Sequence, residues 1–152
     1  MDDIAHAVDH EADVKAKFRT GRTPAWQWPN EAALAGFLDA VVLRGLSFKL
    51  TGGLHHAVRG TFGDGTAAEP MHGLLNVLAA TADALDGAEA PELAVVLAET
   101  DTARLVELVT QLDDDSAART RASFAAYGCC GVLDPITELQ ALGLIAPAPQ
   151  SH

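Results

Sequence analysis

The chain has 152 residues, enough for one domain with a sizeable hydrophobic core. Hydrophobic residues make up 49% and charged residues 20%, a balance typical of folded proteins rather than disordered ones. The formal net charge of −11 at pH 7 argues against a surface that binds nucleic acid or an anionic membrane.

The cysteines and the N-terminal residues indicate where the protein is expected to work. Cys129 and Cys130 are adjacent and form no disulfide framework, so a reducing cytoplasm is expected. The N-terminal residues lack the basic and apolar regions of a signal peptide, and no apolar stretch reaches the roughly 18 residues of a membrane helix. We expect a cytoplasmic protein with an N-terminal arm over 1–13, a single α/β domain over 14–145 and a loose tail over 146–152.

The first expected elements are a strand and a helix. Residues 14–21 alternate basic and apolar side chains, the pattern of a strand with one polar face formed by Lys15, Lys17 and Arg19. An edge strand protected by lysines would show the same pattern. A loop with two tryptophans follows, and its rings either cover a pocket or pack on the domain. Asn30 then provides the N-cap of a helix that ends near Gly45.

A second strand over 46–51 follows this helix directly. The order strand, helix, strand within about 40 residues is typical of a parallel βαβ unit. Side chains alternate along a strand, so Lys49 and Thr51 share one face and the apolar residues share the other. A lysine within a short apolar strand is unusual, because burial of an unpaired charge is costly. Such a lysine is usually paired or functional.

The remaining elements are marked by prolines, glycines and acidic residues at their ends. We expect a loop over 61–69, helices over 70–86, 91–97 and 101–112 (the last stopped by the acidic run 113–115), a strand over 121–128 and a helix after Asp134 that ends at Gly143. Three such strands supply only part of a closed (β/α)₈ barrel, which needs about 250 residues. The fold class is therefore α/β with parallel βαβ units, either half of a (β/α) barrel or a small open sheet with helices.

Polar residues and glycines follow each expected strand. Ligands of parallel α/β folds bind beyond the carboxyl ends of the strands, so these residues predict a site for a small anionic molecule. The catalytic candidates are Lys49, His55 and His56. The candidates for substrate binding are Lys17, Arg19, Thr20, Thr51, Gly52, Gly53, Arg59, His72, Asn76 and Cys130.

The residue types suggest a reaction on a small anionic carbonyl or phosphate compound, of the lyase, aldolase or isomerase kind. Lys49 would be a base or an imine-forming amine. Lys17 and Arg19 would hold the anion, and the amides of Gly52 and Gly53 would donate to it. One of the two adjacent histidines would transfer protons. We expect no cofactor and no metal at this site.

Two further interpretations of the same residues remain open. His55, His56, His72 and Cys130 would serve a metal-dependent hydrolase, although adjacent histidines on an extended segment point in opposite directions. Structural roles are the other interpretation: one histidine bonds the backbone, Cys130 is a small packed residue, and His72 and Asn76 cap a helix. The chain would then be a binding or assembly subunit that completes a partner chain.

Four segments resemble blocks of a largely uncharacterised bacterial family. They are Lys17-Phe-Arg-Thr-Gly21, Phe48-Lys-Leu-Thr-Gly-Gly-Leu-His-His56, His72-Gly-Leu-Leu-Asn-Val77 and Tyr127-Gly-Cys-Cys-Gly131 followed by Asp134-Pro135. The resemblance spans about residues 14–145 and implies the C-terminal half of a longer barrel-like protein. Family members have Gly-Gly where this chain has Gly21-Arg22, and Ala-Gly where it has Gly52-Gly53. More distantly, the lysine strand is similar to Schiff-base aldolases of the deoxyribose-phosphate type.

A small parallel sheet also predicts assembly. Three parallel strands leave two unpaired edges and one face that few helices can cover. We therefore expect a homodimer, or a heteromer that completes a barrel, with an interface that includes apolar residues of a strand or of the helix over 70–86.

Overall fold

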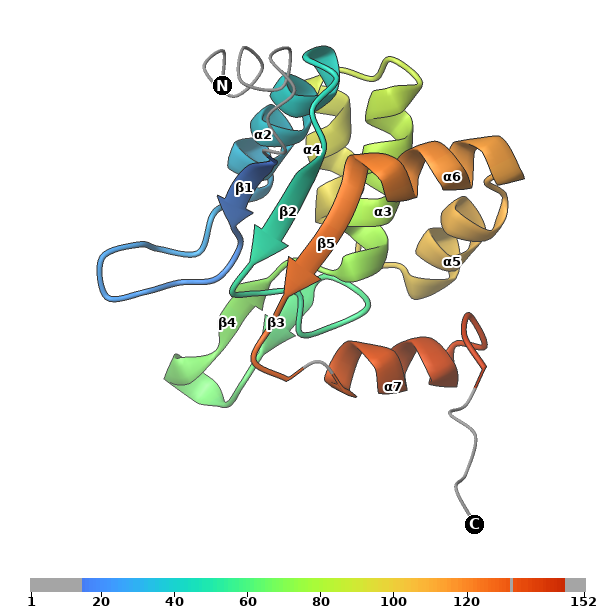
Figure 1. Cartoon of the computed structure of the whole chain (residues 1–152). Helices are drawn as coiled ribbons and strands as arrows, with labels where there is room; N and C mark the ends of the chain where they lie inside the picture. Colours follow the sequence, from blue (N-terminus) through green and yellow to red (C-terminus); the bar gives the residue numbers. More distant parts are fainter. Residues whose placement is uncertain (1–14, 132, 147–152) are drawn as a thin grey trace.

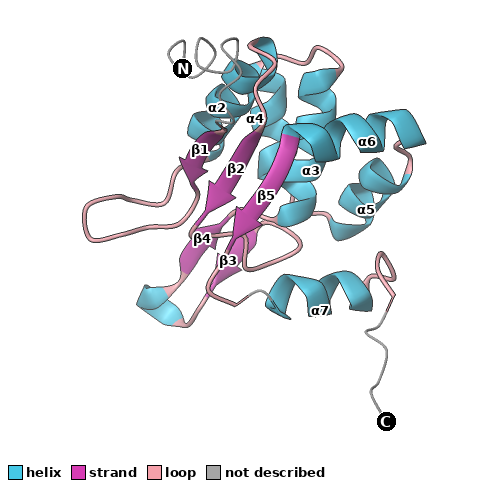
Figure 2. Ribbon diagram, viewed as in Figure 1, coloured by secondary structure: helices cyan, strands magenta, loops and turns pink. Residues whose placement is uncertain are grey.

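The computed structural model describes residues 15–131 and 133–146, so the expected arm over 1–13 and all but the first residue of the expected tail lie outside it. The chain is mixed α/β, which confirms the predicted fold class with a small open sheet (Figures 1 and 2). Its strands are β1 (Ala16–Arg19), β2 (Phe48–Thr51), β3 (Gly60–Phe62), β4 (Glu69–Met71) and β5 (Phe124–Gly128). Its helices are α2 (Glu31–Leu43), α3 (Leu74–Leu85), α4 (Ala90–Ala98), α5 (Thr102–Thr110), α6 (Asp114–Ser123) and α7 (Leu133–Ala141), with a 3₁₀ turn η1 (Gly65–Ala67).

The main sheet has three parallel strands in the order β1-β2-β5. Parallel neighbours require crossover connections, which α2 provides between β1 and β2 and helices α3 to α6 provide between β2 and β5. Figure 1 shows α2, α3 and α4 behind the sheet and α5 and α6 beside it, with the β3–β4 hairpin beyond the carboxyl ends of the strands. This arrangement leaves the other face of the sheet toward the viewer.

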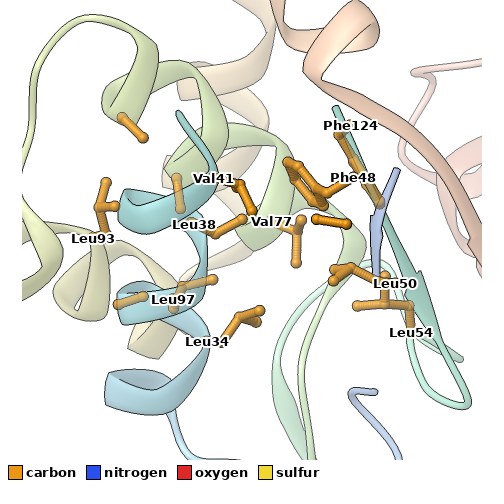
Figure 3. Close-up of a cluster of buried hydrophobic side chains, with 14 of the residues drawn as sticks. Leu34, Leu38, Val41, Phe48, Leu50, Leu54, Val77, Leu93, Leu97 and Phe124 are labelled. Carbon is orange, nitrogen blue, oxygen red and sulfur yellow. The ribbon is translucent and has the colours of Figure 1, made fainter. Parts of the chain in front are cut away.

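The hydrophobic core lies between the sheet and helices α2, α3 and α4. Phe48 and Leu50 of β2 are fully buried, and Phe48 stacks on Phe124 of β5 with ring centroids 5.2 Å apart. Helix residues such as Leu38, Val77, Leu93 and Leu97 complete the cluster (Figure 3). The alternation of each strand thus places its apolar side chains against the helices.

The segment from β1 to β2 forms as its end signals predict. Asn30 caps α2, because its side chain accepts a hydrogen bond of 2.9 Å from the amide of Ala33. Gly45 adopts a φ of 63° just after the helix, a conformation that glycine allows. Leu54 has a positive φ of 60° although it carries a side chain, and its complete burial offsets part of that strain.

Three expectations about the middle of the chain are wrong. Pro70 does not open a helix but lies in the edge strand β4, and the expected loop over 61–69 contains β3 and η1. The acidic run does not end a helix but begins α6, where Asp113 is the N-cap and two further carboxylates favour the positive helix end. Most side chains of helix α3 are buried within the chain, and the expectation that apolar residues of this helix or of a strand form an interface stays a prediction.

No helix in the described part of the chain is long and apolar enough to span a membrane.

Candidate functional site

The open face of the sheet carries a pair of lysines. Lys17 of β1 and Lys49 of β2 are partners in the parallel register, on neighbouring strands whose spacing is about 4.8 Å. Both side chains are exposed, and no carboxylate of residues 15–131 and 133–146 is recorded within ion-pair distance of either. Arg19 and Thr51 are the next partners on this face. The prediction that Lys17, Arg19 and Lys49 share one face near the same strand ends is confirmed.

The guanidinium of Arg19 is partly used in hydrogen bonds to the backbone that follows β1. Its Nε donates to the carbonyl of Gly21 over 3.1 Å, and one terminal nitrogen donates weakly to the carbonyl of Arg22 over 3.4 Å. The guanidinium lies against Gly52, where a Cβ atom would approach it to 2.8 Å. Arg19 therefore fixes the turn after β1, and only part of its donor set remains for an anion.

The glycines after the strands allow backbone to pack on backbone. A Cβ at Gly21 would overlap the carbonyl oxygen of Gly52, and one at Gly53 would lie 2.6 Å from Oγ1 of the buried Thr20. The amide of Gly52 donates to the carbonyl of Gly128 over 2.8 Å. The expected role of Gly52 as an amide donor to an anion is therefore wrong, because its N–H is already used to join β2 to β5.

The two adjacent histidines have different surroundings. His56 Nδ1 lies 2.7 Å from Oε1 of Glu138 in α7, and its ring stacks on Phe62 with centroids 3.3 Å apart. The other oxygen of Glu138 accepts from the amide of Ala57. His55 is half-buried. Within the described ranges no three His, Cys, Asp or Glu side chains could hold a metal ion, so the alternative interpretation of these residues as a metal site is not supported there.

Asn76 holds helices together rather than contacting a ligand. It is fully buried, and its Oδ1 accepts from the amide of Arg59 over 2.9 Å. Its Nδ2 donates to the carbonyls of Val96 and Glu99 over 3.0 and 2.8 Å, at the end of α4. Since these bonds use both ends of the amide, the expected substrate-binding role is wrong.

Arg59 and His72 line a small cavity at the start of α2. The guanidinium of Arg59 forms an ion pair with Glu31, and His72 Nε2 lies 2.8 Å from the carbonyl of Pro29. Burial lowers the pKa of His72 below its usual 6.5, which favours the neutral ring. Trp28 lines the same cavity, so one ring of the tryptophan loop covers a pocket while Trp26 is exposed.

The cysteines after β5 lack the environment of a nucleophile. Cys130 is exposed, and burial raises the pKa of the Cys129 thiol above its usual value. A reactive cysteine needs a stabilised thiolate, which basic neighbours or a helix start provide. Cys130 lies at the predicted end of the sheet, with no catalytic feature of its own.

Comparison of the chain with protein-family models, with curated proteins and with solved structures found no match. The resemblance to a bacterial barrel-like family therefore stays a prediction. The candidate site rests on the geometry of this chain alone.

Sequence reasoning missed the carboxylates that engage the candidate residues. Glu31 and Glu138 lie in helices, and Glu31 pairs with Arg59 while Glu138 pairs with His56. The spacing of apolar residues predicts which face of a helix is buried. It does not indicate which carboxylate on the helix contacts a histidine or arginine that is distant in the chain. Glu31 did carry one signal, as the first residue after a capped helix start, where acidic side chains are favoured.

Proposed function

We propose that this chain is one half of an enzyme that acts on a small anionic carbonyl compound, with the amine of Lys49 as the reacting group. The observation that supports it is the pairing of Lys17 with Lys49 on the open face of a parallel sheet. Two ammonium groups side by side attract a carboxylate or phosphate, and the protein as a whole is acidic, so the cationic face is a local exception.

The chemistry needs one lysine to bind and one to react. Lys17, with the remaining donors of Arg19, would hold the anionic group. The Lys49 nitrogen would attack the carbonyl carbon, the carbonyl oxygen would leave as water, and the resulting iminium would accept the electron pair of an adjacent breaking bond. If Lys49 acts as a base instead, it removes a proton next to the carbonyl and no covalent bond forms.

The face has to be closed for this reaction, because electrostatic attraction is weak where water surrounds the charges. In the described structure β1 and β5 each pair with only one strand, so the sheet can be extended at both edges. We propose that a second copy of the chain closes the site, as the two halves of a barrel would do.

Borohydride trapping tests the imine. The protein is incubated with pyruvate, glyoxylate or glyceraldehyde 3-phosphate, reduced, digested and mapped by mass spectrometry. The chain has only three lysines, Lys15, Lys17 and Lys49, so the modified amine is assigned directly. We expect one adduct on Lys49 that is lost in Lys49→Arg and weakened in Lys17→Arg. Lys15→Arg is the matched control and should keep the adduct; equal labelling of all three lysines contradicts the imine mechanism.

A second candidate function is a non-catalytic assembly subunit. The open face and the unpaired edges favour it as much as they favour catalysis, because both require a covering partner. Light scattering at micromolar concentration separates assembly from a self-sufficient domain: a dimer has twice the 15.9 kDa of the chain. A monomer that persists at high concentration argues against both the half-enzyme and the assembly subunit.

A further inference from the structure

A cavity among the helices has the size and lining of a second binding site. Its volume is about 400 Å³, within the range of cavities that bind small molecules. Residues of α3, α5, α6 and α7 line it, and Figure 1 shows α7 below α5 and α6. Leu144 and Ile145, which follow α7, complete the wall. Neither Lys17 nor Lys49 lines this helical cavity, so it is separate from the lysine face.

The wall of the helical cavity is a hydrophobic cluster that the chain itself does not fully bury. Leu78, Val109 and Leu139 line the cavity and pack on the cluster of the buried Leu75, but each is only partly buried. Ile145 is 39% exposed. The main core contrasts with this, because its leucines and Phe48 are fully buried. An apolar group bound in the cavity would therefore remove further apolar surface from water.

The described polar residues that line the cavity are two threonines and an arginine. Oγ1 of Thr110 donates to the carbonyl of Val106 over 2.7 Å, and Oγ1 of Thr120 donates to the carbonyl of Ser116 over 2.8 Å. A hydroxyl has one proton, so neither threonine has a donor left for a ligand. Arg121 is exposed, and its guanidinium makes no hydrogen bond or ion pair with the described residues. Its donors are free to bind an anion.

Other arginines on the surface have the partner that Arg121 lacks. Arg22, Arg104 and Arg119 are also exposed, yet each pairs with a carboxylate. The chain has 21 acidic residues against 10 lysines and arginines, so a cation without a carboxylate is an exception on this surface. No Asp or Glu is among the described residues that line the cavity. An anion beside Arg121 would therefore be attracted without a lining carboxylate to repel it.

We propose that the helical cavity binds a free monocarboxylate with an unbranched apolar tail of about eight carbons. The tail would lie against the aliphatic wall, where the threonine protons are already used. The carboxylate would accept from the guanidinium of Arg121, whose paired donors match its two oxygens. This proposal does not depend on the reaction assigned to Lys49, which needs an aldehyde or a ketone that a saturated monocarboxylate lacks.

Octanoate and 1-octanol make a matched pair of probes, since they share a tail length and differ in the charge of the head group. The chain has three isoleucines, so the methyl spectrum of isoleucine-labelled protein is simple, and Ile145→Val assigns the signal of Ile145. We expect octanoate to shift this signal saturably with a Kd of about 0.1–1 mM. Hexanoate should bind about tenfold more weakly, because each buried methylene changes affinity about fourfold.

Two arginines of α6 provide the matched variants. Arg121→Gln should weaken octanoate binding at least about fivefold and change 1-octanol binding by less than about twofold, because only octanoate uses the charge. Arg119→Gln is the control: Arg119 is exposed on the same helix, pairs with Asp86 and lies outside the cavity lining. It should bind octanoate like the unmodified chain. A cation in the last turn of α6 also favours the helix, but that role does not distinguish octanoate from 1-octanol.

Three results would overturn the proposal. The first is an Ile145 signal that octanoate does not saturate, and the second is hexanoate binding as tightly as octanoate. The third is an equal loss of octanoate binding in Arg121→Gln and Arg119→Gln, which would indicate a general effect of charge. Octanoate binding that is lost in Lys49→Gln but kept in Arg121→Gln would place the anion on the lysine face and would also contradict it. Borohydride trapping on Lys49 can fail without affecting any of these measurements.

Discussion

The two faces of the three-stranded sheet are built from the same strands but have opposite chemistry. On the covered face, Phe48 and Leu50 are fully buried against α2, α3 and α4. On the open face, Lys17 and Lys49 lie side by side in solvent. One residue of sequence separates the two environments, because successive strand side chains point to opposite sides.

The covered face explains stability, and the open face carries the proposed function. Parallel sheets are normally covered on both sides, so a polar open face requires an explanation. Burial of apolar area contributes to folding on one side, while charged side chains on the other contribute little to it. Substitutions made on one face at a time therefore show how much each face contributes to stability.

The largest effect is expected at neighbouring residues of β2. Phe48→Ala removes a ring that is fully buried and contacts both Phe37 and Phe124, so the free energy of unfolding should fall by about 3–5 kcal/mol. Lys49→Ala should change it by no more than about 0.5 kcal/mol. Urea unfolding followed by circular dichroism measures both. If Lys49→Ala is as destabilising as Phe48→Ala, the open face is part of the core and the comparison fails.

The next largest effect on stability is expected at Asn76, which was predicted to bind substrate but instead holds structural elements together. Asn76→Asp preserves shape, yet the aspartate cannot donate to the carbonyls of Val96 and Glu99 and introduces a charge at a fully buried position. We expect a loss of about 2–4 kcal/mol in the free energy of unfolding, measured by the same urea titration. Unchanged stability would return Asn76 to the list of ligand-binding candidates.

Local signals predicted most of the fold. The alternation around Lys17 and Lys49 placed both on one face, and the Asn30 cap with Gly45 located α2 within one or two residues. The same signals failed where one residue type serves two purposes. Pro70 suits a helix start and an edge strand equally well, and Asp113 suits a helix stop less than the N-cap it forms.

The candidate site was harder to predict, because the partners of its residues are distant in the chain. His56 meets Glu138, and Asn76 meets Val96 and Glu99, through contacts that only the tertiary structure defines. Glycines were expected to expose amides to a ligand, and instead Gly21 and Gly53 permit close packing between strand ends. Both uses need the same absence of a side chain, so the sequence does not separate them.

A smaller effect is expected from pH, through His72. Desolvation lowers its folded-state pKa below the usual 6.5, so the unfolded state binds more protons between the folded pKa and 6.5. Stability should therefore fall as pH decreases through that window and level off below the folded pKa. The slope is at most about 1.4 kcal/mol per pH unit for one proton.

His72→Gln isolates this effect, because glutamine can still donate to the carbonyl of Pro29 but does not titrate. Urea unfolding at several values between pH 5 and 7.5 should show a smaller decrease in stability for the variant than for the unmodified chain. If stability depends on pH equally in the variant and in the unmodified chain, the pKa of His72 is the same in the folded and unfolded states. Water would then reach the His72 ring more than its burial indicates.

The smallest effect on stability is expected at Asp83, a carboxylate in the layer of helices that covers the sheet. Asp83 of α3 is half-buried, and its pKa is raised, first by desolvation and then by the neighbouring Asp86 and Glu92 carboxylates. A raised folded-state pKa means that the native state holds its proton to higher pH than the unfolded state. Stability from this group is therefore present at low pH and is lost as pH rises through the folded pKa.

At pH 7 Asp83→Asn should raise the free energy of unfolding, by less than about 1 kcal/mol because solvent still reaches the side chain. At pH 3, where the carboxyl is largely protonated in both states, the gain should vanish. A variant that gains equally at both pH values would show that amide contacts, and not charge, account for the change.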